Sequence, residues 1–200
     1  TMLELLTVIG GLALFLFGVR MLSQGMEQLA GGKIQEWLDK ATNRPLKGAV
    51  FGAVATALIQ SSSLLMVTMI GLISARLLSL EQAIGVMLGQ EIGTTMTGQL
   101  VAFKVGSIRF VAIAVGFAML EFGHERKYQR YGQILMGFGL LFTGIELMAE
   151  TLKPLATNPV AAQLLAQLAQ TPLLGVLAGA ILTAIIQSSS ATTGLVIAMG

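Results

Sequence analysis

A polar four-residue motif, Gln-Ser-Ser-Ser, occurs twice in this chain, each time in the middle of a long apolar stretch. The first copy is residues 60–63 within the apolar stretch 46–75, and the second is residues 187–190 within 173–200. Four adjacent polar side chains are costly to bury unless each of them finds a hydrogen-bond partner. Because this polar motif occurs in an apolar stretch twice, we expect both copies to bind something polar.

The similarity between the two halves extends beyond the motif. With an offset of 127 residues, a proline, two glycines and a threonine also align: Pro45 with Pro172, Gly48 with Gly175, Gly52 with Gly179 and Thr56 with Thr183. With an offset of 126, Gly18 aligns with Gly144. Matches at a fixed offset indicate an internal duplication. We predict a first repeat over residues 1–122, a cytoplasmic basic loop over 123–130, and the start of a second repeat over 131–200.

The composition predicts an integral membrane protein, which we expect to be all-α and to lie in the cytoplasmic (inner) membrane. The chain is 54% hydrophobic and 11% charged, whereas soluble domains carry about 25% charged residues. A net charge of +2, without a basic run interleaved with aromatics, argues against nucleic acid as a partner. There is no cysteine and His124 is the only histidine, so a thiolate or multi-histidine metal site is excluded. No nucleophile–base pair is visible, which argues against an enzyme or a bound cofactor.

Several segments are long enough to cross a bilayer, which requires about 20 apolar residues. Residues 3–22 and 131–150 meet this requirement at equivalent places in the two repeats, and 108–122 is a minimal span. Residues 80–103 are long enough, but the polar, glycine-rich stretch 89–98 interrupts them. We therefore predict a broken transmembrane helix there, with an unwound or bent centre.

The stretch 46–75 is either one spanning helix or a re-entrant hairpin whose tip is the first motif. Each arm of a hairpin would be about 18–21 Å long at 1.5 Å per residue, too short for a core of about 30 Å. The positive charges favour the hairpin, because it inverts the second repeat and gathers eight cations on one side: Lys33, Lys40, Arg44, Lys47, Arg76, Arg126, Lys127 and Arg130. Only Lys104, Arg109 and Lys153 then lie opposite, which is the asymmetry expected of a cytoplasmic face. A spanning helix would make the repeats parallel and leave four cations against seven.

The chemistry of the motifs suits small ions. Hydroxyl and amide oxygens are ligands for a hard cation such as sodium, and hydroxyls beside free backbone N–H groups suit an oxyanion. Inverted repeats that bring two interrupted segments together at mid-membrane depth are typical of secondary transporters. The alternative is that the serines and threonines only hold helices together.

Together these motifs resemble the bacterial type II sodium/phosphate cotransporters. The resemblance rests on the two Gln-Ser-Ser-Ser motifs, on Gly-Gln-Glu-Ile-Gly-Thr-Thr at 89–95, and on Ser-Ala-Thr-Thr at 190–193. It implies sodium-coupled phosphate symport by alternating access, with both ions bound where the hairpin tips meet. It also implies that the protein is embedded in membrane lipid and is a candidate homo-oligomer. The implied substrate- and ion-binding residues are Gln60, Ser61, Ser62, Ser63, Glu91, Thr94, Thr95, Thr97, Gln187, Ser188, Ser189, Ser190 and Thr192. Sodium is expected at Gln60, Ser63, Glu91, Gln187 and Ser190.

The chain departs from the family pattern at two points. Glu91 stands where the pattern has Asn, so it could strengthen cation binding, carry a proton, or mark a different substrate. The second repeat's counterpart of 89–97 is expected near position 220, so we expect an incomplete transport domain. Two other functions therefore remain open: a carrier of another anion or organic acid, proton-coupled through Glu91, and a membrane module that does not transport. Arg20 and Glu146, at matching positions in the repeats, are further candidates for function.

Overall fold

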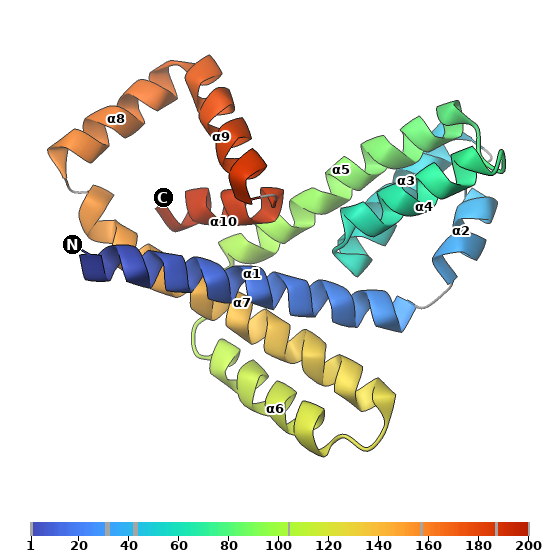
Figure 1. Ribbon diagram of the computed structural model, residues 1–200, viewed down its shortest axis with the longest axis horizontal. Coiled ribbons are helices and arrows are strands. Elements are labelled where there is room, and N and C mark those ends of the chain that lie inside the picture. Colours follow the sequence, from blue (N-terminus) through green and yellow to red (C-terminus); the bar gives the residue numbers. More distant parts are fainter. Residues whose placement is uncertain are drawn as a thin grey trace.

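The computed structural model describes residues 2–30, 33–41, 44–103, 105–156, 158–186 and 188–199, and these residues form helices without any strand (Figure 1). The ten helices are α1 (Met2–Ala30), α2 (Lys33–Ala41), α3 (Pro45–Ile59), α4 (Ser62–Ser74), α5 (Leu80–Ala102), α6 (Ile108–Phe122), α7 (Arg126–Ala156), α8 (Pro159–Gln170), α9 (Pro172–Ile186) and α10 (Ser189–Met199). The all-α prediction is confirmed. Within the described residues, two helical segments, Met2–Ala30 and Arg126–Pro154, are long and apolar enough to cross a membrane.

Helices α1 and α7 pack against each other in antiparallel orientation through glycines. Gly11 lies against Gly144, and Gly18 lies against Gly137. A Cβ atom added at Gly144 would be 2.5 Å from the carbonyl oxygen of Gly11, and one added at Gly18 would be 2.6 Å from that of Gly137. The absence of side chains at these positions lets the two backbones touch, as small residues do in membrane helix pairs.

Helix α5 is continuous from Leu80 to Ala102, so the predicted break at 89–98 is wrong. The glycines serve packing instead. A Cβ atom at Gly89 would overlap the carbonyl oxygen of Ala49 in α3, and one at Gly52 in α3 would overlap the carbonyl oxygen of Val86. The threonines of the stretch also stay within the helix, since Thr94 and Thr95 donate hydrogen bonds to carbonyl oxygens of their own helix.

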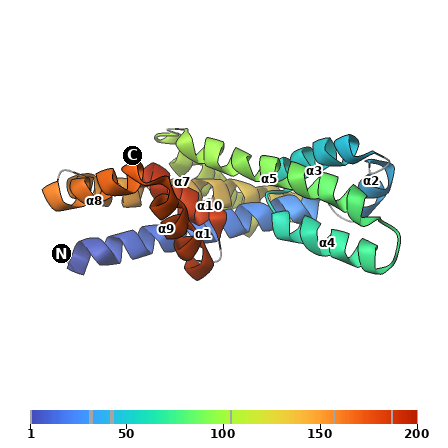
Figure 2. The same ribbon diagram turned by 90° about the horizontal axis from the view of Figure 1, so that it is seen from above.

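The stretch 46–75 is interrupted at the first motif, as the hairpin prediction requires. Helix α3 begins with Pro45, which fits the first turn because that position needs no N–H donor. It ends at Ile59 and is followed by Gln60, whose φ of 57° is left-handed. We call Gln60 and Ser61 tip one. From tip one, α3 and α4 run back toward the end of the molecule where α2 lies (Figures 1 and 2). The alternative of a single helix through 46–75 is wrong.

The second motif lies at an equivalent junction. Helix α9 also begins with a proline, Pro172, and ends at Ile186, and α10 starts at Ser189. We call Ser188, the described residue between these helices, tip two. A buried cluster from α1, α5, α7 and α10 holds α10 beside the α1–α7 pair, and its members include Phe15, Val101, Leu141, Met148 and Ala191. This cluster brings the second motif toward the first.

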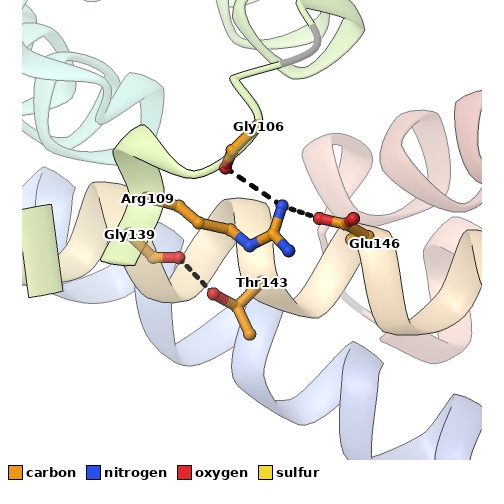
Figure 3. A network of polar contacts seen from close by, with 5 residues as sticks. All are labelled: Gly106, Arg109, Gly139, Thr143 and Glu146. Carbon is orange, nitrogen blue, oxygen red and sulfur yellow. Dashed lines mark hydrogen bonds and ion pairs between the residues drawn. The ribbon is translucent and has the colours of Figure 1, made fainter. Parts of the chain in front are cut away.

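Helix α6 folds back on α7 after the turn at 123–125. The predicted basic loop 123–130 is largely helical, because α7 already begins at Arg126 and the carbonyl oxygen of Glu125 accepts the N–H groups of Tyr128 and Gln129. At the other end of α6, the guanidinium of Arg109 forms an ion pair with Glu146 of α7 and donates to the carbonyl oxygen of Gly106 at 3.1 Å (Figure 3). Glu146 thus joins two helices, whereas Arg20 is exposed.

Candidate functional site

The two Gln-Ser-Ser-Ser motifs face one cavity of about 290 Å³. Its walls come from five helices and both tips, although the motifs are separated by more than half of the chain. The lining residues are Val19 and Ser23 of α1, Thr56 of α3, Gln60 and Ser61 of tip one, Ser62 and Ser63 of α4, Thr94 and Thr97 of α5, Ser188 of tip two, and Ser189 and Ser190 of α10. All but Val19 are polar, and none carries a charge.

Gln60 is held in its left-handed conformation by three hydrogen bonds. Its backbone carbonyl accepts the hydroxyl of Ser23 at 2.7 Å, and its side-chain oxygen Oε1 accepts the hydroxyl of Thr97 at 2.5 Å. Its side-chain amide donates to the carbonyl oxygen of Ala57 at 2.6 Å. A left-handed residue other than glycine is unfavourable on its own, so these contacts from α1, α3 and α5 fix the shape of tip one.

Each motif supplies the first turn of a helix that starts at the cavity. The hydroxyl of Ser61 accepts the N–H of Leu64 at 3.4 Å, and that of Ser188 accepts the N–H of Ala191 at 3.2 Å. Serine is a preferred residue at this capping position. The first turns of α4 and α10 therefore present further backbone N–H groups to the cavity, at the end of the helix where the dipole favours negative charge.

Four serine hydroxyls of the cavity are available to a ligand. Within the described residues, the hydroxyls of Ser62, Ser63, Ser189 and Ser190 form no hydrogen bond with the protein. Each hydroxyl can donate one hydrogen bond and accept two. Because the serines lie on two helices that start at the same cavity, a small ion there could contact both motifs at once.

Thr56 adds a hydroxyl that sequence reasoning missed. Its side chain is 2% exposed, and its Oγ1 has no hydrogen-bond partner in the described structure. A buried polar atom without a partner is unusual and calls for an explanation such as a bound ion or water. The sequence held a signal for Thr56, since this residue lies one helical turn before Gln60 and aligns with Thr183. Ser23 and Val19, which were also missed, had no such signal.

Nine of the predicted site residues meet at this cavity, three do not, and one lies outside the described residues. The structure brings together Gln60, Ser61, Ser62, Ser63, Thr94, Thr97, Ser188, Ser189 and Ser190. Glu91 and Thr95 lie on the exposed face of α5 and do not line the cavity. Thr192 lies behind tip two, where its hydroxyl accepts that of Thr183 at 2.9 Å and contacts the carbonyl oxygen of Ser188. Gln187 lies outside the described residues.

The chemistry of the cavity is that of an uncharged binding site. The described part of the chain contains no cluster of three or more histidine, cysteine or acidic side chains that could hold a metal tightly. The hydroxyl and amide oxygens are suited to weak binding of a hard cation. The hydroxyl and backbone N–H donors are suited to an oxyanion. For sodium, the cavity gathers Gln60, Ser63 and Ser190, but not Glu91.

Comparison with known proteins gives matches that together cover most of the chain. The profile of a family described as Na+/Pi-cotransporter matches residues 14–150 and 144–200. YqeW of Bacillus subtilis (strain 168) is 32% identical over 194 residues, which are 97% of this chain. The putative inorganic phosphate export protein YjbB of Escherichia coli (strain K12) is 24% identical over 95% of this chain. The sodium-dependent phosphate transport protein 2A of Rattus norvegicus is 35% identical over half of it.

The match covers only part of each relative. The chain spans 63% of the length of YqeW, 35% of YjbB and 16% of the rat transport protein. No solved structure matches the chain.

Proposed function

Because the chain belongs to the Na+/Pi-cotransporter family, we propose that it forms the ion-binding core of a sodium-coupled phosphate symporter in the cytoplasmic membrane. The observation that supports this proposal most strongly is the single cavity shared by both Gln-Ser-Ser-Ser motifs. A packing role for the serines would not require their hydroxyls to face a cavity. Four of these hydroxyls face it without a partner among the described residues.

Phosphate fits the donors of the cavity. The anion has four oxygens that can accept hydrogen bonds, and the cavity offers serine hydroxyls from both motifs together with the first-turn N–H groups of α4 and α10. Helix starts are common sites for phosphate because their N–H groups and dipole both favour negative charge. The volume of about 290 Å³ also leaves room for more than one small ion.

The absence of charge in the lining supports coupling to a cation. Moving a phosphate anion into an uncharged site at membrane depth has a large cost in free energy unless an opposite charge accompanies it. Among the described residues, no lysine or arginine lines the cavity to supply that charge. Sodium bound by hydroxyl and amide oxygens such as those of Gln60, Ser63 and Ser190 would supply it, so phosphate and sodium would each bind poorly without the other.

We further propose that the two repeats are inverted in the membrane and that α3–α4 and α9–α10 are re-entrant hairpins. The arms of the first hairpin, with 15 and 13 residues, are about 22 and 20 Å long at 1.5 Å per residue. Each is shorter than a hydrocarbon core of about 30 Å. Such broken backbone at membrane depth is tolerated where it lines a cavity, and both tips do so. Transport by alternating access would then expose the cavity to each side in turn.

The test is phosphate uptake into proteoliposomes that contain the complete natural protein. We expect labelled phosphate to accumulate when a sodium gradient is directed inward, and to stay at the level of protein-free vesicles when potassium replaces sodium. Uptake that is equally fast in potassium would refute sodium coupling. Sodium-driven uptake of an organic acid in place of phosphate would refute the proposed substrate.

A second candidate function is phosphate export, which the name of the relative YjbB gives for that protein. The same cavity would serve export if the physiological gradients drive phosphate outward. Vesicles loaded with labelled phosphate distinguish the two functions. Efflux that requires internal sodium is the reverse reaction of the symporter, whereas efflux that is independent of sodium would favour a separate export mechanism.

A further inference from the structure

A groove between α9 and the start of α10 repeats, position by position, a surface of α3 and α4. This α9 groove has a volume of about 540 Å³ and is lined by Gly179, Ala180, Thr183, Ala184 and Ser189. At the offset of 127, the counterparts of these residues are Gly52, Ala53, Thr56, Ala57 and Ser62. All five pairs are identical in residue type. The similarity between the two halves of the chain therefore extends to a whole surface and is not confined to the serine motif.

In the first half of the chain, this surface is where α5 packs. A Cβ atom added at Gly93 of α5 would be 2.8 Å from the Cβ atom of Thr56 and 3.1 Å from the backbone nitrogen of Ala57. A Cβ atom added at Gly89, one turn earlier on α5, would also overlap the backbone of α3. Two glycines four positions apart lie on one face of a helix, and here they let two backbones approach closely. The surface on α3 thus accepts a helix with glycines at that spacing.

The corresponding surface on α9 is open. Every residue of α9 is described, and none of them is buried. Helix α3, by contrast, buries Gly48, Gly52, Ala55, Thr56 and Ile59. A Cβ atom added at Gly179 would meet nothing within 4 Å. Membrane lipid could cover the large exposed side chains of α9, such as those of Val176 and Ile181. Lipid gives no reason for glycine at position 179, because glycine weakens a helix and is useful only where a close neighbour needs the space.

The α9 groove is continuous with the ion-binding cavity. Ser189 lines both of them. Its counterpart Ser62 shares the cavity with Thr94 and Thr97 of α5. A helix in the α9 groove would therefore bring side chains to the cavity beside Ser189, as α5 does beside Ser62.

We propose that the α9 groove is the docking site of the second repeat's own counterpart of α5, a helix near position 220 of the complete natural protein. This helix packs on α9 through two glycines one turn apart, as α5 packs on α3, and it completes the wall of the cavity beside Ser189. The role in the cavity rests on the proposed function, whereas the packing rests only on the repeated surface. The chain spans 63% of the length of its relative YqeW, so that relative has further chain to supply such a helix.

The first test is steric and uses the complete natural protein in detergent. The open space at Gly179 predicts no cost for Gly179→Leu, whereas a docked helix predicts a clash. We expect Gly179→Leu to lower the melting temperature by about 4 °C or more, the shift that follows from overpacking a close contact. Gly52→Leu should lower it in the same way, since α5 already occupies the matching surface.

The control for this test is Ile185→Phe, which enlarges another side chain of α9. Ile185 is exposed, and so is its counterpart Leu58 on α3. Because neither side chain faces a neighbouring helix, we expect Ile185→Phe to keep the parent melting temperature. A melting temperature of Gly179→Leu that equals or exceeds that of the parent would overturn the proposal.

The second test identifies the occupant and does not depend on the folding of Gly179→Leu. A diazirine side chain of about the size of valine replaces Val176, whose counterpart Ala49 contacts Gly89 of α5. After illumination of the complete protein in lipid vesicles, we expect mass spectrometry to find a cross-link within one chain, to a segment beyond residue 200. A product of twice the mass would show that a second copy fills the groove, and adducts with lipid alone would show that lipid does. Either of these results would overturn the proposal.

Neither readout depends on transport, so the two proposals can fail separately. If the expected cross-link forms but sodium does not drive phosphate uptake, the proposed function is refuted and the docking site stands. If uptake is driven by sodium but the cross-links reach only lipid, the docking site is refuted and the proposed function stands.

Discussion

Gly18 of α1 and Gly137 of α7 each occupy the space that a side chain of the other would need. A Cβ atom added at Gly18 would be 2.6 Å from the carbonyl oxygen of Gly137, and one added at Gly137 would be 2.7 Å from that of Gly18. Gly11 and Gly144 form a second pair of this kind. The offset of 126 that aligns the two repeats relates Gly11 to Gly137 and Gly18 to Gly144. Each glycine of one contact pair therefore corresponds to a glycine of the other pair. The contact between the repeats thus has a local two-fold relation, with the helices antiparallel.

This relation predicts the cost of substitution at Gly18. Gly18→Val should destabilise the protein by about 1–3 kcal/mol, the usual cost of overpacking a close contact, because the added atoms would meet the backbone of α7. Thermal unfolding of the purified protein in detergent measures the effect. Gly10→Ala is the matched control, since a Cβ atom at Gly10 meets nothing within 4 Å. A melting temperature that falls equally in both variants would contradict the packing role of Gly18.

The sequence was sufficient to predict the helical class and the interruption of the apolar stretch at the first motif. These features follow from local patterns such as Pro45, Pro172 and the two serine runs. The continuity of α5 could not be predicted in this way. Gly89 would favour an unwound centre if the helix were alone, but in the structure Ala49 of α3 occupies the space beside it. Local propensity was overridden by tertiary packing.

The sequence predicted that the two serine motifs line a binding site, but it did not predict that Ser23 contributes to the same cavity. The serine runs are visible because polar clusters stand out in apolar sequence. Ser23 is a single serine in a helix of mixed composition, and its role depends on the distance to Gln60, which no local pattern encodes. Glu91 was selected as an unusual charge in a family motif. The helical periodicity of α5 places Thr94 and Thr97 toward the cavity and Glu91 on the exposed face.

The serine hydroxyls of the two motifs should matter equally for phosphate. Ser62→Ala and Ser189→Ala each remove one hydroxyl while leaving the backbone N–H groups in place. Each should weaken phosphate binding by about 1–3 kcal/mol, or roughly 5- to 150-fold, as measured by the phosphate dependence of sodium-driven uptake. Thr68→Val is the control, because Thr68 lies on α4 and its hydroxyl donates to the carbonyl oxygen of Leu64 in its own helix. If both serine variants take up phosphate like the parent, the serines serve helix packing and do not bind phosphate.

The ion pair between Arg109 and Glu146 should stabilise the contact of α6 with α7 (Figure 3). The Arg109 side chain is 15% exposed and that of Glu146 is 41% exposed. We expect a coupling of about 1–2 kcal/mol, between the values of exposed and of buried pairs. A double-mutant cycle of Arg109→Gln and Glu146→Gln, read by thermal unfolding, measures it. Additive effects of the two substitutions would show that the pair contributes nothing.

A substitution of Glu91 tests whether the residue at this position of the family pattern binds an ion in this chain. Because Glu91 lies outside the cavity on the exposed face of α5, we expect Glu91→Gln to retain the sodium and phosphate dependence of the parent. Thr97→Val serves as the comparison, since it removes the hydroxyl that holds the Gln60 side chain and should weaken both. A lower sodium affinity or a flattened pH profile in Glu91→Gln would instead support the sequence-based prediction that this carboxylate binds the coupling cation or a proton.

The proposed inversion of the second repeat predicts which ends of the molecule share a side of the membrane. Since α1 and α7 are antiparallel, the end of α1 lies beside the start of α7, where Arg130 donates to the carbonyl oxygen of Gln28 at 2.9 Å. Helix α2 and the basic start of α7 therefore lie at one end of the molecule, and α8 lies toward the other (Figures 1 and 2). Gathering lysine and arginine at one end is the pattern of a cytoplasmic face.

Single cysteines at Lys40, Arg126 and Gln163 test this arrangement, because the parent contains no cysteine and gives no background labelling. An impermeant thiol reagent should label positions 40 and 126 in inside-out vesicles and position 163 in right-side-out vesicles. Labelling of all three from one side would rule out inversion of the second repeat. Labelling of position 126 from the side opposite to position 40 would instead support a parallel arrangement. That arrangement is incompatible with the antiparallel glycine contact between α1 and α7, because both helices would then cross the membrane in the same direction.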